Sequence, residues 1–207
     1  MAQLFLVRHG KSVWNKAGLW TGRTDVPLSE EGIAEAQKTA KLLATIHIDH
    51  AHVSNLKRAQ ETLDYIQREA RSPFKIFKTD ALNEKDYGIY TGKNKWQVKK
   101  DVGDEEFLRI RRSWDYVLPE GESLKDVYER AVPYFETRVV PELKNGKNIL
   151  IVAHMNSLRT LAKKIENISD TGICDLEIGT GEIHHYVFDA DETFRKKKII
   201  TPDDSRT

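Results

Sequence analysis

Short apolar runs alternate along this chain with longer stretches in which apolar residues recur every three or four positions. The runs at residues 3–7, 51–55 and 148–153 are typical of short buried strands. Residues 74–79 alternate apolar and polar side chains, which is the period of a strand. A further run at residues 183–189 is expected to close the sheet. The hydrophobic pattern therefore predicts five strands.

The stretches between these strands have the period of amphipathic helices. Helices are predicted at residues 28–46, from about Leu56, from Ser123 to Val139 and at residues 157–167. Ser29 stands where the cap of the first of these helices is expected. Residues 82–114 are polar, show no clear period and are expected to be irregular. Strands that alternate with helices predict an α/β fold, with a mainly parallel central sheet flanked by helices on both faces.

The length of the chain bounds its organisation. Its 207 residues suit one large α/β domain, and no internal repeat, linker or low-complexity stretch divides them. Hydrophobic residues make up 39% and charged residues 31%, so an ordinary core can form. We expect a single domain over residues 1–207, with a flexible tail at about residues 194–207.

Charge and cysteine content exclude several classes of protein. Lys and Arg total 33 against 32 acidic residues, which argues against a nucleic-acid binder that relies on bulk charge but leaves a local cationic pocket open. Cys174 is the single cysteine, so no internal disulfide can form and a reducing compartment is expected. The N-terminus has no signal-peptide pattern, and no apolar stretch approaches the roughly 20 residues that span a bilayer. We expect a cytoplasmic protein without membrane or nucleic-acid partners, either a monomer or a homo-oligomer.

Two histidines follow strongly predicted strands. His9 lies two positions after residues 3–7, and His154 directly after residues 148–153. The carboxyl ends of parallel strands meet at one edge of a sheet, so both imidazoles are expected in the same crevice. Basic and amide side chains accompany these strand ends and the one before Arg58: Arg8, Asn15, Arg58, Asn156 and Arg159. Together they favour an anion site suited to phosphate, although purely structural histidines remain an alternative.

The other histidines favour structural roles. His47, His50 and His52 imitate a metal cluster, but no cysteine or second histidine group completes such a site. His184 and His185 are adjacent in a predicted strand, so their side chains point to opposite faces. The sequence therefore predicts no metal site.

Motifs in a fixed order extend from Leu4 to Asp189. They are "LVRHGKSVWN", "TGRTDVPLSEEG", "LKRAQET", "LNEKDYG", "GKNK", "RRSWD", "GESLKD" and "AHMNSLR". In these motifs the chain resembles the histidine phosphatase superfamily, and within it the compact short form of the cofactor-dependent (2,3-bisphosphoglycerate-dependent) phosphoglycerate mutases. The resemblance implies a phosphoglycerate mutase-like fold and a small, anionic, phosphorylated substrate. It also implies interconversion of 3- and 2-phosphoglycerate in glycolysis and gluconeogenesis, priming by 2,3-bisphosphoglycerate, and no metal.

The resemblance also implies roles for individual residues. His9 matches the nucleophile that becomes phosphohistidine, and Glu84 matches the proton donor and acceptor. The other residues that match the family's catalytic phosphate pocket are Arg8, Arg58 and His154. The residues expected to bind substrate are Asn15, Thr21, Gly22, Tyr87, Lys95, Arg111, Arg112 and Asn156. Lys11 and Met155, which do not match the family's pattern, are also expected to bind substrate.

Several positions depart from the pattern of the mutases. Lys11 stands where they usually carry glutamate, and Met155 where they usually carry glycine. Arg23 replaces a usual tryptophan, and Asp86 is also unusual. We expect Lys11 to disfavour the His9 imidazolium and to attract a multiply charged substrate. Methionine at position 155 adds bulk and an apolar flank, which would narrow the pocket.

Two other functions remain open on the same scaffold. One is a phosphomonoester or bisphosphoglycerate phosphatase, which needs only the phosphate pocket. The other is a catalytically weak phosphate-binding paralog, which the residues Lys11 and Met155 would favour.

Overall fold

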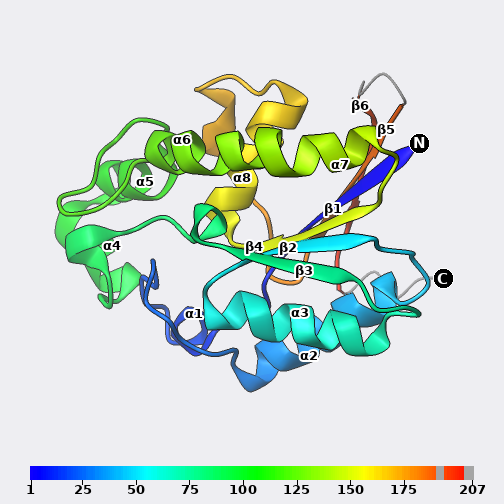
Figure 1. The fold of residues 1–207 in the computed structure, drawn as a ribbon. Coiled ribbons are helices and arrows are strands. Elements are labelled where there is room, and N and C mark those ends of the chain that lie inside the picture. The colour runs from blue at the N-terminus through cyan, green and yellow to red at the C-terminus, as the bar shows by residue number, and fades with distance from the viewer. Residues whose placement is uncertain (190–193, 203–207) are drawn as a thin grey trace.

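The computed structural model describes residues 1–189 and 194–202, and it contains one six-stranded sheet in the order β3-β2-β4-β1-β5-β6 (Figure 1). The strands are β1 (Ala2–Arg8), β2 (His50–Ser54), β3 (Lys75–Thr79), β4 (Ile149–Ala153), β5 (Ile183–Phe188) and β6 (Phe194–Ile200). The first four strands in this order are parallel, whereas β5 and β6 are antiparallel to their neighbours. The predicted mainly parallel α/β sheet is confirmed.

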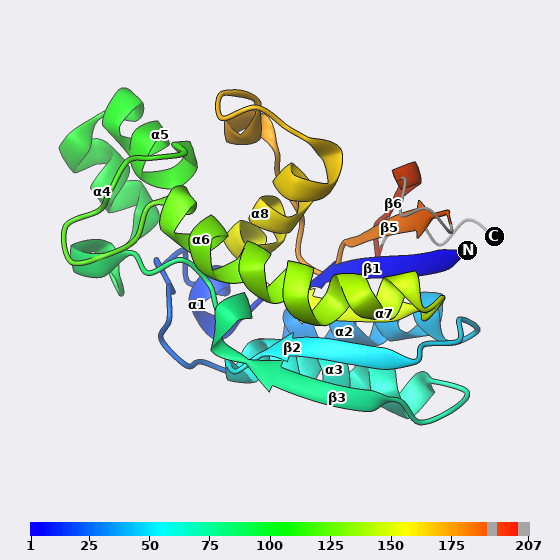
Figure 2. The same cartoon turned by 45° about the horizontal axis from the view of Figure 1, so that its top comes forward.

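Strand β1 shows why helices are needed on both faces of the sheet. Leu4 and Leu6 belong to one apolar cluster, and Phe5 and Val7 belong to a second cluster on the opposite face. The alternation follows from the two-residue period of a strand. The first cluster packs against α6 (Leu124–Tyr134), α7 (Val140–Lys144) and α8 (Met155–Glu166), and the second against α2 (Glu30–Leu43) and α3 (Lys57–Glu69) (Figures 1 and 2).

Two of the predicted helices begin at serine caps. The Ser29 hydroxyl accepts from the Gly32 amide at the start of α2, which confirms the predicted cap. Ser123 caps α6 in the same way through the Asp126 amide. After Pro133, which lacks an amide hydrogen, the helix passes through a π-helical turn (η3, Phe135–Val139) into α7.

The prediction that residues 82–114 are irregular is wrong. This stretch holds α4 (Lys95–Val102) and α5 (Asp104–Arg112), which Gly103 separates with a φ of 82°. Each helix has two to three turns, so a 3.6-residue period has little length in which to appear. A third apolar cluster supports these helices: Trp20, Tyr87, Val98, Phe107, Ile110 and Leu118. The remaining short elements are α1 (Val13–Lys16), η1 (Asp80–Leu82), η2 (Gly88–Tyr90) and η4 (Gly172–Asp175).

The prediction of a flexible tail is wrong for residues 194–200. These residues form β6, which pairs with β5 so that Ile200 lies opposite Ile183. Lys197 of this strand donates to Glu166 at 2.8 Å. The reason is pairing to the edge of β5, a tertiary contact that the local sequence does not reveal. Residues 203–207 of the expected tail lie outside the described residues.

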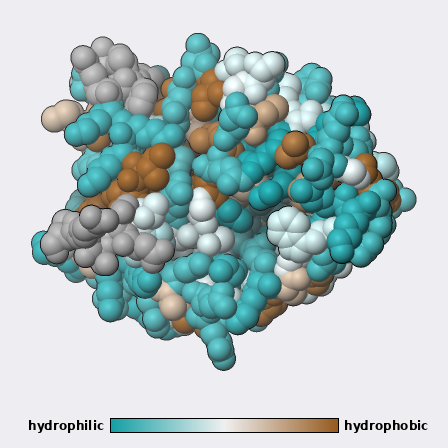
Figure 3. Space-filling model, turned by 180° about the vertical axis from the view of Figure 1, so that it is seen from behind, coloured by the Kyte–Doolittle hydropathy of each residue, from teal (hydrophilic) through white to brown (hydrophobic). Residues whose placement is uncertain are grey.

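The surface of the molecule is mainly polar. Hydrophilic residues cover most of the face in Figure 3, with hydrophobic residues in smaller groups between them. No helix among the described residues is both long and apolar enough to cross a membrane.

Candidate active site

His9 follows the carboxyl end of β1 and is only 2% exposed. Its Nδ1 lies 2.6 Å from the Gly10 carbonyl oxygen, which can only accept, so Nδ1 carries the proton. The lone pair is therefore on Nε2, where the Nε of Arg58 donates at 3.2 Å. Burial, followed by the charges of Arg58 and Arg8, holds the His9 pKa well below its usual range. His9 is thus a neutral imidazole whose Nε2 lone pair faces the Arg58 guanidinium.

The turn after His9 requires glycine. A Cβ on Gly10 would lie 2.2 Å from the Gly32 carbonyl oxygen, which is far inside van der Waals contact. Gly10 therefore lets the start of α2 pack directly against the strand end. The Gly10 amide also donates to the Thr62 hydroxyl of α3 at 3.2 Å. Helices α2 and α3 together hold the loop that carries His9.

Arg58 lies in the first turn of α3 and is 1% exposed. Besides His9, its guanidinium donates to the Gly22 carbonyl at 2.8 Å and the Thr24 carbonyl at 2.9 Å. Burial lowers the Arg58 pKa to about 10, so the group is still charged at neutral pH. Gly22 has a φ of +52°, a conformation that side chains disfavour. Arg58 thus joins the nucleophile candidate to the loop of Thr21 and Gly22.

His154 follows the carboxyl end of β4, and its ring is fully buried. Its ring centroid lies 4.8 Å from that of His9, edge to face. Its Nε2 lies 2.7 Å from the Ser54 hydroxyl at the end of β2. Burial, and then the charge of Arg58, holds the His154 pKa well below its usual range. The two histidines that sequence placed at one edge of the sheet are therefore in contact.

Several donors around these histidines have no hydrogen-bond partner among the described residues. They are Arg8 Nε, Trp20 Nε1 and Thr21 Oγ1, all of them buried. An unpaired buried donor costs about 1–3 kcal/mol. Arg8, Trp20 and Thr21 line one cavity with His9, so these donors are well suited to an oxygen-rich anion.

Glu84 lies in the wall of the same cavity and is 7% exposed. Its Oε1 accepts from the Lys85 amide at 2.8 Å and the Asn156 amide at 3.2 Å. Asn156 is in the first turn of α8, and its side-chain amide donates to the Tyr87 hydroxyl at 2.9 Å. Two backbone amides thus hold one carboxylate oxygen, and the other makes no hydrogen bond to a described residue.

A second group of cations borders the cavity beyond Glu84. Lys95 begins α4, and Arg111 and Arg112 end α5. Burial, followed by the charges of Arg8 and Arg111, lowers the Lys95 pKa to about 8. Arg111 lies 3.5 Å from the carboxylate of Glu177, which also pairs with Arg112. This side of the cavity holds three cations and one carboxylate.

The structure brings together most of the residues expected from the sequence. Those that line the cavity are Arg8, His9, Asn15, Thr21, Gly22, Arg58, Glu84, Tyr87, Lys95, Arg111 and Met155. His154 and Asn156 contact the lining residues His9 and Tyr87, and Arg112 contacts Glu177. Trp20, Glu177, Ile178 and Gly179 also line it and were not predicted. No motif identified them, and only their proximity in the folded chain does.

Lys11 is not placed with these residues, so its expected role needs correction. Its ammonium lies 2.9 Å from Glu31 and 3.9 Å from Glu35, both in α2, and it does not line the cavity. The hydrogen bond with Glu31 raises the Lys11 pKa. The cations that lower the His9 pKa are Arg58 and Arg8 instead. Because acidic residues of α2 lie beside position 11, they attract the lysine side chain away from the cavity.

The remaining histidines that we considered occupy separate structural positions. His50 and His52 both contact the Glu142 carboxylate, at 2.8 and 3.3 Å. His184 is buried, whereas His185 stacks on an aromatic ring from β1, so the two point to opposite faces as predicted. Within residues 1–189 and 194–202, no group of three or more potential ligand side chains is arranged to hold a metal ion.

Comparisons with known proteins identify the family of this chain. The sequence profile of the histidine phosphatase superfamily (branch 1) matches residues 4–199. A protein from Bradyrhizobium diazoefficiens, named 2,3-bisphosphoglycerate-dependent phosphoglycerate mutase, is 43% identical, with 94% of this chain and 95% of the relative covered. A protein of the same name from Cytophaga hutchinsonii is 42% identical, with 91% and 88% covered.

A solved structure extends the likeness to the fold. Bacillus stearothermophilus YhfR superposes with a TM-score of 0.81 at 23% identity, over 94% of this chain and 95% of the other. Since the profile and both relatives cover almost the whole chain, the protein belongs to branch 1 of the histidine phosphatase superfamily, among relatives named 2,3-bisphosphoglycerate-dependent phosphoglycerate mutase.

Proposed function

We propose that this protein is a 2,3-bisphosphoglycerate-dependent phosphoglycerate mutase, which interconverts 3-phosphoglycerate and 2-phosphoglycerate through phosphohistidine at His9. The observation that carries the proposal is a cavity with two cationic sides. Arg8 and Arg58 surround the neutral His9, and Lys95 and Arg111 lie beyond Glu84. A three-carbon substrate with a phosphate and a carboxylate needs both sides. The names of the relatives support the same assignment.

The chemistry begins at Nε2 of His9. Its lone pair attacks the substrate phosphorus, an N–P bond forms, and the bond from phosphorus to the ester oxygen breaks. The Glu84 carboxyl group gives its proton to the leaving oxygen and becomes a carboxylate. In the second half, a substrate hydroxyl attacks the phosphorus and gives its proton to Glu84, and the N–P bond breaks. Glu84 then has its proton again, His9 is free, and a new ester bond joins the phosphorus to the oxygen of the attacking hydroxyl.

Charge in the transition state is stabilised by fixed donors. Arg8 and Arg58 lie on either side of His9, and backbone carbonyls already orient them through hydrogen bonds. Such preorganised donors stabilise the equatorial phosphoryl oxygens without reorganisation during the reaction. Asn15 in the cavity wall is a further donor for the same group.

The residues fit 2,3-bisphosphoglycerate as well as the substrate. The unpaired donors Arg8 Nε and Thr21 Oγ1 would bind one phosphate, and Lys95 and Arg111 the other. When bound, the bisphosphate supplies the phosphoryl group that primes His9. We expect the activity to need no metal, because arginines supply the positive charge at the phosphoryl group. As an enzyme of glycolysis and gluconeogenesis, the protein would act in the cytoplasm.

Glu177 gives weight to a second candidate, a phosphatase on the same scaffold. Its carboxylate pairs with Arg111 and Arg112, the cations expected to retain a bisphosphorylated intermediate. A phosphatase needs the His9 side of the cavity only, since water then accepts the phosphoryl group. If Arg111 and Arg112 retain the bisphosphorylated intermediate only weakly, phosphate release is favoured over isomerisation.

Rates of isomerisation and phosphate release decide between the two candidates. With 3-phosphoglycerate as substrate, we expect isomerisation to exceed phosphate release, to rise with added 2,3-bisphosphoglycerate and to persist in EDTA. His9→Ala should abolish both rates and the acid-labile phosphoenzyme. Phosphate release that outpaces isomerisation would establish the phosphatase, and strict dependence on a divalent metal would reject the mutase mechanism.

A further inference from the structure

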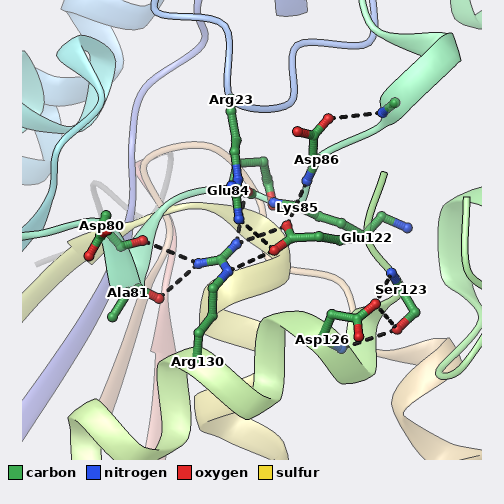
Figure 4. Close-up of polar contacts among 11 residues, drawn as sticks. Arg23, Asp80, Ala81, Glu84, Lys85, Asp86, Glu122, Ser123, Asp126 and Arg130 are labelled. Carbon is green, nitrogen blue, oxygen red and sulfur yellow. Dashed lines mark hydrogen bonds and ion pairs between the residues drawn. The ribbon is translucent and has the colours of Figure 1, made fainter. Parts of the chain in front are cut away.

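Arg130 lies outside the cavity and contacts the backbone of Glu84. Arg130 of α6 donates from Nη2 to the Glu84 carbonyl at 3.0 Å and from Nη1 to the Ala81 carbonyl at 2.8 Å (Figure 4). Its Nε and Nη2 also donate to the two carboxylate oxygens of Glu122, at 3.0 and 3.2 Å. All three donor nitrogens of this guanidinium are used, so its orientation is fixed.

Glu122 connects this arginine to two further segments. Its Oε2 accepts from the Asp86 amide at 2.8 Å, two residues after Glu84. Its Oε1 accepts from Arg23 at 2.5 Å, next to Gly22 in the loop that Arg58 holds (Figure 4). The backbone is therefore held on both sides of Glu84 by one ion pair.

Neither partner of this ion pair lines the cavity. The exposed fraction of the side chain is 20% for Arg130 and 16% for Glu122, so water screens the pair only partly. If one charge is removed, the other remains partly buried without a counter-ion. The backbone groups that the pair binds, the Glu84 carbonyl and the Asp86 amide, are then held less firmly. The segment that moves would be the one that carries Glu84.

We propose that Arg130 and Glu122 are positioning residues for proton transfer by Glu84, and that Arg23 links them to the substrate loop. The ion pair holds the Glu84 carbonyl and the Asp86 amide, so that the Glu84 carboxyl group keeps its position at the leaving oxygen. Arg23 is the outer part of this network and is 46% exposed, so its contribution is the smallest. The inference rests on the proposed role of Glu84 as proton donor.

Leaving groups of different acidity separate positioning from a merely structural role. The alkoxide that leaves 2,3-bisphosphoglycerate is strongly basic and needs a proton as the P–O bond breaks. The p-nitrophenolate that leaves p-nitrophenyl phosphate is weakly basic and departs without one. Loss of Glu84 positioning therefore slows phosphorylation of His9 by the first donor and leaves the second almost unaffected. A distorted phosphate pocket would slow both.

The test is the single-turnover rate at which phosphohistidine forms from each donor. For Glu84→Gln we expect a loss of roughly 10²-fold with 2,3-bisphosphoglycerate and less than about threefold with p-nitrophenyl phosphate. Glu122→Gln, which keeps the side-chain shape, should lose about tenfold with the first donor and less than about threefold with the second. Arg130→Lys keeps the charge but cannot reach every acceptor, and should give the same pattern. Glu129→Gln removes an exposed charge from the same helix and should match the wild type.

Each result has a definite meaning. Equal slowing of both donors by Glu122→Gln and Arg130→Lys would overturn the positioning role, and so would wild-type rates in both variants. If Glu84→Gln itself slows both donors equally, the proposed proton-transfer role of Glu84 fails and the inference fails with it. If only Glu84→Gln depends on the leaving group, the proposed function stands and the inference alone is wrong.

Discussion

The two cationic sides of the cavity are built in different ways. The proposed phosphate pocket of Arg8, His9, Arg58 and His154 lies at the ends of β1 and β4 and the start of α3. Its arginines bind backbone carbonyls, and its two histidines are almost fully buried. The far side comes from the ends of short helices, where Arg111 and Lys95 are partly exposed.

The side chains on the two sides of the cavity are therefore held with different firmness. The phosphate pocket is held by contacts that cannot rearrange without breaking buried hydrogen bonds. The far side pairs its arginines with the 59% exposed Glu177, a contact that an anionic ligand can replace. We infer that the first side performs the chemistry and that the second governs affinity. Four measurements test this division.

The largest effect is expected at Arg58. Arg58→Ala removes the guanidinium beside His9 Nε2, and kcat should fall roughly 10²- to 10³-fold, as when one preorganised donor is lost. A coupled assay of isomerisation measures this loss. Arg68→Ala removes an exposed arginine from the same helix and should leave kcat unchanged. A kcat for Arg58→Ala within tenfold of the wild type would contradict the assignment.

The second largest effect is expected in the pH dependence of stability. His9 and His154 stay neutral in the fold, because their pKa values lie well below the ordinary 6.5. Below pH 6.5 the unfolded chain binds protons at both and the folded chain does not, so stability falls as the pH falls. The expected slope is about 2.7 kcal/mol per pH unit for the pair.

Urea unfolding between pH 5 and 7.5 measures that slope. Replacing one of the pair, as in His9→Asn, should lower it by about half. Arg111→Ala should leave it unchanged, because the far side has no such histidine. An unfolding free energy that does not decrease between pH 6.5 and 5 would show that these imidazoles are not held neutral.

Arg111 should affect binding more than chemistry. Arg111→Ala is expected to raise the KM for 3-phosphoglycerate about tenfold to a hundredfold, the usual range for a charged hydrogen bond. The rate of His9 phosphorylation by p-nitrophenyl phosphate, which has no second anionic group, should change little. Arg109→Ala in the same helix, exposed and paired with Glu106, is the control. An equal loss with both donors would mean that the two sides are not separable.

The smallest effect is expected at Glu177. Glu177→Gln removes the carboxylate that competes with substrate for Arg111 and Arg112, so KM should fall by up to about fivefold while kcat is unchanged. Asp175→Asn removes an exposed charge from the same loop and serves as the control. A higher KM in Glu177→Gln would indicate that this carboxylate supports the arginines and does not compete.

The meeting of the two histidines could be predicted from the sequence for a local reason. Strands at residues 3–7 and 148–153 have continuous apolar runs, and parallel strands end at one edge of the sheet. His9 and His154 therefore meet whatever the details of packing. The family motifs added Glu84 and the arginines of α5, which have no local pattern of their own.

The direction of the Lys11 side chain could not be predicted from the local sequence. Lys11 is two residues from His9 in sequence, but its ammonium pairs with Glu31 and Glu35 of α2, at 2.9 and 3.9 Å. Glu177 shows the reverse, since it lies far along the chain from Arg111 and yet shares its wall of the cavity.

By itself, the sequence determined the α/β class, the strand ends that carry His9 and His154, and the family. These depend on hydrophobic period and on motifs, both of which are local. Three features emerge only in the folded chain: α4 and α5 form over a third apolar cluster, residues 194–200 add a strand, and Glu122 and Arg130 hold the backbone around Glu84. Those features depend on contacts between distant segments, and no short stretch of sequence contains the partners that make them.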